Sequence, residues 1–304
     1  MNWTEIKRMV SRKIRESVPG TFEHVVLNKD KILATYENKP KVQDLIVSMT
    51  TYAPRIKSFE YAILSLLGGS VLPEKIYVYI PKGFLSLLAD SDSFLKPEYD
   101  KGFITLVEME IDYFCHSKYY YSFLNYGATK DILICDDDII YYKDWVKHIA
   151  ESAQKYPEYA VFAYKAVEVG VVNGKIEPYD NWVHCSKANQ GENKLLFSEG
   201  VGGVLYRKGM LKKEVLNTAK FLELTPKADD VWLWFCTYLN HCKIKYILPY
   251  KNQKLLYVVP DSQNSALWID NTIGKRTDVY VDNCNKYFLE KYNMNITDFT
   301  NTNK

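Results

Sequence analysis

The chain has 304 residues, of which 47% are apolar and 25% are charged, and its 39 basic and 37 acidic side chains leave a formal charge of +2. This composition is typical of an ordinary globular protein with one large domain or two closely joined ones. The balanced charge excludes a dedicated nucleic-acid-binding protein, which would carry a basic face, so we expect no nucleic-acid partner.

Residues 3–18 have the spacing of an amphipathic helix. Trp3, Ile6, Val10 and Ile14 fall on one face, and five basic residues lie elsewhere around it. Such a helix either packs on the main domain or lies on an anionic membrane surface. Both alternatives stay open, and the second predicts peripheral membrane contact.

From residue 44 onward, short apolar runs alternate with segments of helical spacing. The predicted strands cover residues 45–49, 75–80, 103–107 and 131–135, and the predicted helices between and after them cover residues 56–69, 118–125 and 143–155. This alternation indicates an α/β fold with a mainly parallel, Rossmann-like sheet flanked by helices. Ligands of such sheets bind beyond the carboxyl ends of the strands, so we expect the chemistry in the loops that follow them.

The second half of the chain is less regular. Asn173-Gly174 is a hairpin signal. Helices are predicted at residues 208–219 and 228–241, and a strand is predicted at residues 243–248.

The six cysteines include no C-x-x-C pair, so the sequence predicts neither a zinc cluster nor a dense disulfide framework. We interpret them as reduced thiols, which favours a cytoplasmic location. No stretch approaches the roughly 20 apolar residues that cross a bilayer. Residues 1–5 lack the apolar segment of a secretory signal.

Three consecutive carboxylates follow the predicted strand at residues 131–135. Asp136, Asp137 and Asp138 stand together at its carboxyl end, where like charges repel one another unless a cation is present. Carboxylate oxygens suit Mg²⁺ and Mn²⁺, which commonly share their coordination with substrate phosphates. The alternative is a solvated acidic turn that caps the next helix, but the position directly after an apolar strand favours a functional site.

An acidic pair, Asp229 and Asp230, opens the predicted helix at residues 228–241. Acidic residues are common at helix starts because they cap the helix and match its dipole. Beside the acidic triad, one of the two is instead a candidate general base for an acceptor hydroxyl.

Residues 198–204 read SEGVGGV. The glycines either let the backbone approach a ligand closely or form a bulged strand, and both alternatives stay open. Arg55 and Lys118 follow predicted strands and are candidates for binding a diphosphate, although either one alone is also an ordinary surface charge.

Five segments together resemble bacterial-type glycosyltransferases of the GT-A superfamily, close to the family 2 group. They are residues 48–56, 116–120, 136–138, 200–206 and 228–232. The resemblance implies a GT-A-type glycosyltransferase domain over residues 43–250. An N-terminal helix and extension over residues 1–42 would precede it, and a C-terminal extension over residues 251–304 would follow.

The resemblance also implies roles on the donor side. The triad matches the D-x-D motif, in which Asp138 would bind Mn²⁺ or Mg²⁺ and Asp136 would contact the ribose or sugar and share the metal. The remaining donor-binding residues would be Thr50, Tyr52, Arg55, Lys118 and Asp137.

On the acceptor side, the resemblance implies that Gly202 and Gly203 line the site and that Trp182 is a stacking platform. Asp230 would be the base, and because Asp229 stands where many relatives have Glu, the choice between the two stays open. A late histidine completes metal binding in some GT-A enzymes. His184 and His241 are both candidates by position.

The implied activity is metal-dependent hexosyl transfer from a nucleotide-sugar, with UDP as the nucleotide, to a glycan or lipid-linked sugar. Inversion is expected, and retention stays open as the alternative because GT-A folds host both outcomes. Such an enzyme would serve polysaccharide biosynthesis at the inner face of the membrane. One alternative is a phosphatase of the haloacid dehalogenase type, although three predicted strands precede the strand that carries the triad here and Ile139-Ile140 follow the triad. Another is a non-catalytic domain that binds nucleotide-sugars.

Overall fold

The computed structural model describes residues 21–187, 189, 194–211, 213–248, 257–260, 262 and 276–301. The helix predicted at residues 3–18, and with it the question of membrane contact, lies outside these residues. Within them, no helix combines the length and the apolar composition needed to cross a bilayer.

Seven strands form the central sheet, and in chain order they are β1 (Lys41–Thr50), β2 (Leu72–Ile80), β3 (Ile104–Glu108), β4 (Asp131–Ile134), β6 (Val161–Ala163), β12 (Val204–Tyr206) and β13 (Ile244–Tyr246). Their order across the sheet is β13-β6-β12-β4-β1-β2-β3. The pairs β1–β2, β1–β4, β2–β3 and β6–β13 are parallel, whereas β12 runs antiparallel to β4 and β6. The predicted class, α/β with a mainly parallel sheet flanked by helices, is confirmed.

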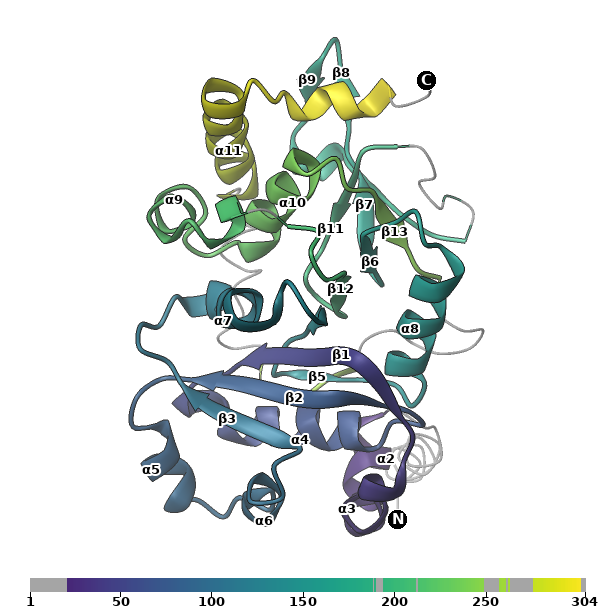
Figure 1. The fold of residues 1–304 in the computed structure, drawn as a ribbon, viewed down its shortest axis with the longest axis vertical. Helices are drawn as coiled ribbons and strands as arrows, with labels where there is room; N and C mark the ends of the chain where they lie inside the picture. The colour runs from purple at the N-terminus through teal and green to yellow at the C-terminus, as the bar shows by residue number, and fades with distance from the viewer. Residues whose placement is uncertain are drawn as a thin grey trace, which may run out of the picture.

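The described helices are α2 (Phe22–Leu27), α3 (Lys29–Thr35), α4 (Ile56–Leu67), α5 (Phe84–Ala89), α6 (Lys96–Tyr99), α7 (Ser117–Tyr126), α8 (Trp145–Lys155), α9 (Thr218–Leu224), α10 (Asp229–Leu239) and α11 (Arg276–Tyr292). Short 3₁₀ turns are η1 (Tyr36–Asn38), η2 (Ala53–Arg55), η3 (Phe114–His116), η4 (Tyr179–Asn181), η5 (Lys213–Leu216) and η8 (Ile296–Asn301). In Figure 1, α2, α3 and α4 lie on one side of β1, β2 and β3, and α7 lies on the other.

Smaller sheets complete the architecture. Strands β10 (Val183–His184), β7 (Ala166–Glu168) and β11 (Leu196–Ser198) form a three-stranded sheet, and β14 (Tyr257–Val258) pairs with β5 (Ile139–Ile140). Strands β8 (Val171–Val172) and β9 (Lys175–Ile176) form the predicted hairpin. Its two turn residues, Asn173 and Gly174, have φ values of 52° and 72°, as a two-residue type I′ turn requires.

The alternation of side chains along β1 divides the hydrophobic core between the two faces of the sheet. Leu45, Val47 and Met49 face the core that α4 and α8 cover. Ile46 faces the other core, to which α7, α9, α10 and α11 contribute. Because both faces are buried, residues 45–49 are a nearly continuous apolar run rather than an alternating one.

Most predicted elements are confirmed to within a few residues, but the helix predicted at residues 208–219 is wrong. Gly209 has a φ of 74° in a turn, and the chain forms η5 and then α9, which begins at Thr218. The start of α9 is fixed by Asn217, whose side chain accepts a hydrogen bond from the backbone N–H of Lys220. An Asn before a helical run is a cap signal that the apolar spacing alone did not reveal.

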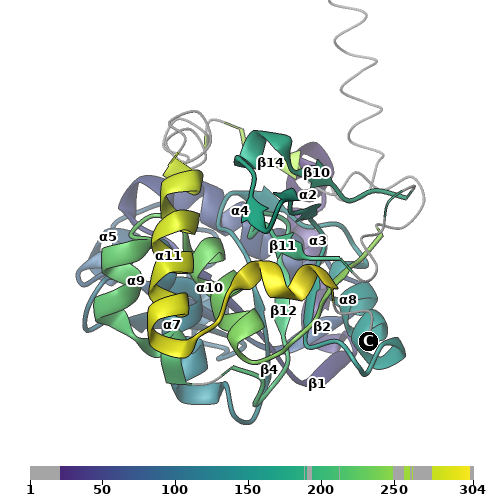
Figure 2. The ribbon, with the colours of Figure 1, turned by 90° about the horizontal axis from the view of Figure 1, so that it is seen from above.

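The division into three parts at residues 42 and 250 stays a prediction. The described residues of the two extensions pack against the middle part. Val25 and Tyr36 of the first extension belong to the core beneath α4, and Cys284 and Phe288 of the last extension belong to the core around α10. Figure 2 shows α11 lying beside α9 and α10.

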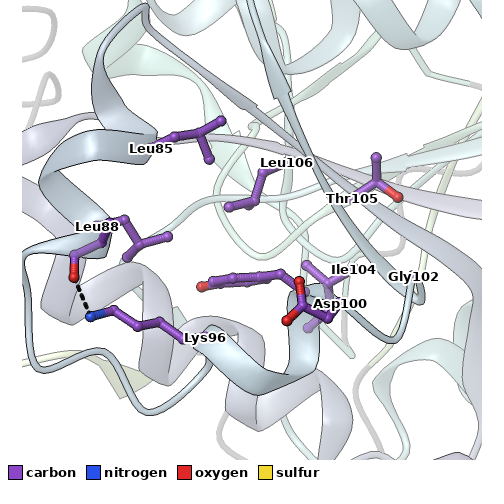
Figure 3. Close-up of a pocket in the computed structure, with 10 residues that line it drawn as sticks. Leu85, Leu88, Lys96, Asp100, Gly102, Ile104, Thr105 and Leu106 are labelled. Atoms are coloured by element: carbon purple, nitrogen blue, oxygen red, sulfur yellow. Dashed lines mark hydrogen bonds between the residues drawn. The ribbon is translucent and has the colours of Figure 1, made fainter.

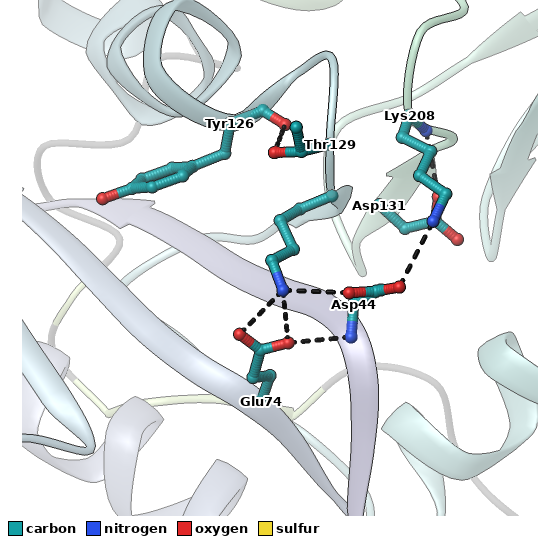
Figure 4. A network of polar contacts seen from close by, with 7 residues as sticks. Asp44, Glu74, Tyr126, Thr129, Asp131 and Lys208 are labelled. Carbon is teal, nitrogen blue, oxygen red and sulfur yellow. Dashed lines mark hydrogen bonds and ion pairs between the residues drawn. The ribbon is translucent and has the colours of Figure 1, made fainter.

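A charged network lies at the amino end of the parallel strands (Figure 4). Lys130 Nζ lies 2.9 Å from Asp44 Oδ1 and 2.7 Å from Glu74 Oε2, and Lys208 Nζ lies 3.3 Å from Asp44 Oδ2. Hydrogen bonds from these two lysines lower the pKa of Asp44 below its usual range. The side chains of the network are 25% to 56% exposed, and ion pairs that solvent reaches contribute little stability.

Candidate active site

Two predicted motifs meet at the carboxyl ends of β1 and β4, which are neighbouring parallel strands. Arg55 ends η2, which follows β1, and the acidic triad follows β4. Arg55 Nη1 lies 2.6 Å from Asp137 Oδ1 and 3.2 Å from Asp138 Oδ2. The guanidinium group is therefore a counter-ion for two of the three carboxylates.

Lys118 joins the triad to the acidic pair. It lies in the first turn of α7, and its Nζ is 3.0 Å from Asp136 Oδ1 and 3.0 Å from Asp229 Oδ2. Lys118 and Asp229 are 7% and 6% exposed. Burial disfavours the charged amine, but the charges of Asp136 and Asp229 hold the pKa of Lys118 well above its ordinary value. A charged lysine therefore bridges two acidic motifs that are far apart in the sequence, since Asp138 and Asp229 are separated by 91 positions.

The triad is not a solvated turn. Asp137 and Asp138 are buried, with 4% and 7% exposure, and the N-cap of α8 is Asp144 rather than a residue of the triad. The alternative in which the triad caps the following helix is therefore wrong.

The positive charge of Arg55 does not fully offset the burial of Asp138 and the negative charges around it. Its burial, with the charges of Asp136 and Asp137, raises its pKa to about 7, while Arg55 and Lys118 act in the opposite direction. A carboxyl whose ionised form is disfavoured by like charges gains from an added cation.

The chemistry of the donor set fits a divalent ion. Within the described residues, no group of three or more His, Cys, Asp or Glu side chains is arranged to hold a metal. Mg²⁺, however, is commonly held by one or two carboxylates together with substrate phosphates. Asp138 and Asp136 would hold such an ion if the contact between Arg55 and Asp138 opened. The two candidate histidines contact other groups: His184 Nδ1 lies 3.6 Å from Glu199 Oε2, and His241 lies against the ring of Phe299.

Asp230 is a carboxyl with the properties of a general base. The N-cap of α10 is Ala228, so neither member of the acidic pair caps the helix. Asp230 Oδ1 accepts a hydrogen bond of 2.9 Å from the N–H of Val231. Burial and the charge of Asp229 raise its pKa to about 7, which suits proton transfer near neutral pH.

Several positioning residues were not singled out in the sequence. Ser48 interrupts the apolar run of β1, and its hydroxyl donates to the carbonyl of Lys118. Ser122 donates to Ser48 Oγ at 2.8 Å and also contacts the hydroxyl of Tyr79 at 2.9 Å. These bonds fix the start of α7 over β1. A serine in the middle of a buried apolar strand was the signal available.

Tyr141 holds the backbone of the triad. Its hydroxyl accepts from the N–H of Asp136 at 2.8 Å and contacts the carbonyl of the same residue at 3.1 Å. The ring packs on Trp145 at 4.2 Å, and Trp145 Nε1 donates to the carbonyl of Gly202 at 2.8 Å. The triad and the glycine segment are therefore supported by one aromatic pair.

His116 holds the loop that precedes the acidic pair. It is fully buried and contacts the carbonyl of Thr225 at 2.7 Å through Nε2 and the hydroxyl of Tyr119 at 3.1 Å through Nδ1. Burial lowers its pKa to about 4, so the ring is neutral and positions the loop rather than carrying charge.

Other predicted site residues lie around this centre. Tyr52 is 38% exposed and its ring lies 5.8 Å from the Arg55 guanidinium carbon, at the edge of the site. The hydroxyl of Thr50 donates to the carbonyl of Tyr79 at 2.9 Å. The expectation for Trp182 is corrected: it is 6% exposed and packs on Tyr179, Phe197 and Trp234 as a core residue, so its ring is not presented as a stacking platform.

Gly203 is required by packing. It has a φ of +100°, and a Cβ atom added there would lie 2.3 Å from Trp145 Cζ2. We expect Gly203→Ala to lower the free energy of unfolding by about 3 kcal/mol in urea titrations, because overpacking adds to the cost of a positive φ. Gly209→Ala is the matched control, since its φ is +74° with no atom within 4 Å of the added Cβ, and it should cost about 1 kcal/mol. Equal losses at the two positions would contradict this packing role.

A separate hollow of about 550 Å³ opens beside the edge strand β3, between α5 and α6. Leu85, Leu88, Leu106 and Tyr99 form its apolar lining, and Lys96 lies at its rim (Figure 3). The hollow includes none of the predicted site residues, and we assign it no role.

Comparisons with known proteins find only distant structural similarity. No family model matches the chain, and no curated protein matches it. One similar solved structure is 4-diphosphocytidyl-2C-methyl-D-erythritol synthase from Anaerococcus prevotii, with 12% identity, a TM-score of 0.43, and coverage of 80% of this chain and 99% of that one. Another is residues 1–349 of TarS from S. aureus, with 14% identity, a TM-score of 0.43, and coverage of 82% and 73%. The residues of the site carry the assignment of function.

Proposed function

We propose that this protein is a metal-dependent glycosyltransferase. It would move a sugar from a nucleotide-sugar, with UDP as the nucleotide, to a hydroxyl of a glycan or lipid-linked sugar, with inversion. Mn²⁺ or Mg²⁺ would be the cofactor.

The observation that carries the proposal is the position of Lys118 between Asp136 and Asp229, 3.0 Å from each. It brings a carboxylate cluster suited to a metal and a diphosphate next to a carboxylate suited to proton abstraction. Arg55 adds a second cation on the triad side. A transferase that uses a diphosphate leaving group and a hydroxyl nucleophile needs both kinds of group within reach of one reacting carbon.

The protein's own residues would divide the work as follows. Arg55 and Lys118 hold the triad in place and present positive charge to a diphosphate. Tyr52, at the exposed edge beside Arg55, offers a ring face to the base of the nucleotide. Asp230 takes the proton from the acceptor hydroxyl as it attacks.

Asp138 and Asp136 would hold the metal. When bound, a divalent ion supplies Lewis-acid stabilisation of charge on the leaving diphosphate. The shortage of positive charge at Asp138 and the mutual repulsion within the triad support this placement.

We expect Asp138→Ala to lower turnover by about 10²- to 10³-fold, a loss typical of removing one electrostatic stabiliser of the transition state. It should also remove the part of UDP binding that depends on Mn²⁺, measured as the difference in melting temperature with the metal and with EDTA. Asp131→Ala, at the opposite end of β4, is the control and should keep both properties. An unchanged metal-dependent shift in the Asp138 variant would show that the metal is not held there.

The test of the proposed function is thermal stability against UDP, GDP, CDP, TDP and their sugars, with and without Mn²⁺. A ligand that binds only the folded state raises the melting temperature by mass action. We expect a metal-dependent rise with one nucleotide class and slow release of the nucleoside diphosphate from its sugar. No rise with any nucleotide would reject the proposal. Metal-dependent hydrolysis of an aryl phosphate without any nucleotide binding would replace it with the phosphatase alternative, and nucleotide-sugar binding without turnover would replace it with the non-catalytic one.

A further inference from the structure

Glu199 is a buried carboxylate whose chemistry the proposed reaction has not used. It follows β11 and precedes the glycine segment, and it is 9% exposed. Its backbone N–H donates to the carbonyl of Lys165 at 3.0 Å. Its Oε1 accepts from the hydroxyl of Tyr179 at 2.9 Å and from Lys165 Nζ at 3.2 Å. One carboxylate oxygen is thus fixed by two donors.

The other oxygen, Oε2, is buried and has no hydrogen-bond partner among the described residues. His184 Nδ1 lies 3.6 Å away, beyond hydrogen-bond distance. A buried hydrogen-bond acceptor that receives no hydrogen bond costs free energy, and such atoms are rare in native structures. Three contacts already hold Glu199 in place, so a hydrogen-bond donor for this oxygen would have to be a group that the described residues do not supply.

Glu199 lies beside the acidic pair and the lysine that binds it. The next residue is Gly200, where an added Cβ would lie 3.5 Å from Lys118 Nζ. The charge of Glu199 contributes to the raised pKa of Asp230, and both carboxylates contribute to the raised pKa of Tyr179. Glu199 and Asp230 therefore lie close enough to each other and to Lys118 to interact in the candidate site.

On the basis of the proposed function, we propose that Glu199 is an acceptor-binding residue that selects a sugar with more than one free hydroxyl. One hydroxyl lies at Asp230 and is the nucleophile. A second hydroxyl of the same ring donates to Glu199 Oε2. His184, whose side chain is 64% exposed, lies beside this oxygen.

The geometry favours hydrogen bonding over the other roles for this carboxylate. The described residues around it do not form a cluster that could hold a metal. Burial also favours a role in which the carboxylate accepts a hydrogen bond from a neutral hydroxyl, because the charge of the carboxylate then stays balanced by Lys165. A simple alcohol, with one hydroxyl, would leave Oε2 unsatisfied and would bind more weakly than a sugar.

The test is the kinetics of Glu199→Gln with methyl glycopyranosides as acceptors, together with their deoxy analogues. Gln keeps an oxygen that accepts from Tyr179, so the fold should be preserved, but its amide group cannot replace the second acceptor oxygen. We expect the acceptor KM to rise about 10- to 100-fold, because a hydrogen bond to a charged group is lost. The UDP-dependent melting shift and the hydrolysis of the donor without acceptor should not change.

A matched control is Glu168→Gln. Glu168 lies in β7 of the same small sheet, where it accepts from Lys194 Nζ at 2.6 Å and from Asn189 Nδ2 at 2.9 Å. This variant should keep the wild-type acceptor KM. With the wild-type enzyme, a deoxy glycoside that lacks the hydroxyl bound by Glu199 should show the same rise in KM as the intact glycoside shows with Glu199→Gln. Combining the deoxy glycoside with the variant should raise KM little further.

Three results would overturn the subsite. They are an unchanged acceptor KM in Glu199→Gln, an equal rise in Glu168→Gln, and a wild-type enzyme that hydrolyses its donor but transfers sugar to none of the glycosides. Failure of the proposed function looks different, because the wild type would then show neither a nucleotide-dependent shift nor donor hydrolysis. That outcome would reject both proposals together.

Discussion

Asp230→Asn is expected to lower turnover by about 10²- to 10⁴-fold, the range that general-base catalysis contributes. Asn has the same size and keeps an oxygen that accepts from the N–H of Val231. It lacks only the basic oxygen that takes a proton. UDP binding, measured by the metal-dependent melting shift, should survive, because the diphosphate is assigned to the triad side of Lys118.

The pH profile gives a second readout for Asp230. Burial and the charge of Asp229 raise its pKa to about 7, so the ionised base is present above that value and is lost as the pH falls through it. In the wild type, kcat/KM should therefore rise up to about pH 7 and then level off. Asp138 also has a pKa of about 7, so both profiles are recorded at saturating Mn²⁺, which favours its ionised form. Under these conditions the Asn variant should lose this inflection in its residual activity.

Asp144→Asn is the control for this substitution. Asp144 is the N-cap residue before α8, on the same domain but outside the acidic pair, and the variant should keep the wild-type turnover and pH profile. Near-normal activity in Asp230→Asn would show that the base is another residue. Asp229, which the sequence left as the alternative, would then be tested next.

The sequence was most informative where one local pattern determines one local structure. The apolar run at residues 45–49 and the carboxylates after residue 135 placed β1, β4 and the triad correctly, because a strand buried on both faces is read directly from composition. The α/β alternation then placed Arg55 and Lys118 at the correct edge of the sheet, since the carboxyl ends of parallel strands share one edge.

The sequence was less informative about side-chain partners. It suggested Arg55 and Lys118 as ligands of a diphosphate, but it gave no means of pairing Lys118 with Asp229, which lies 111 residues further along the chain. Trp182 was assigned by residue type alone, and its burial against Trp234 depends on how the segment after η4 packs against α10. Glu199 stood in a quoted segment, but only the fold shows that one of its oxygens is buried without a donor.

Lys118→Met is expected to lower both stability and turnover. The substitution keeps the length and most of the apolar stem of the side chain but removes the charge that lies 3.0 Å from Asp136 and from Asp229. Breaking a buried ion pair by removing one partner typically costs about 3–5 kcal/mol, because the remaining charges are buried without compensation. The loss should be measured as the free energy of unfolding in urea titrations.

Lys130→Met is the matched control for this prediction. Lys130 also bridges two carboxylates, Asp44 and Glu74, at 2.9 and 2.7 Å, but it does so in an exposed network at the opposite end of the strands. Its loss should have little effect on stability and none on turnover. If the two variants lost the same stability, burial would not be what makes Lys118 important. If Lys118→Met kept its stability and turnover, the coupling between the triad and the acidic pair, and with it the site as described, would be wrong.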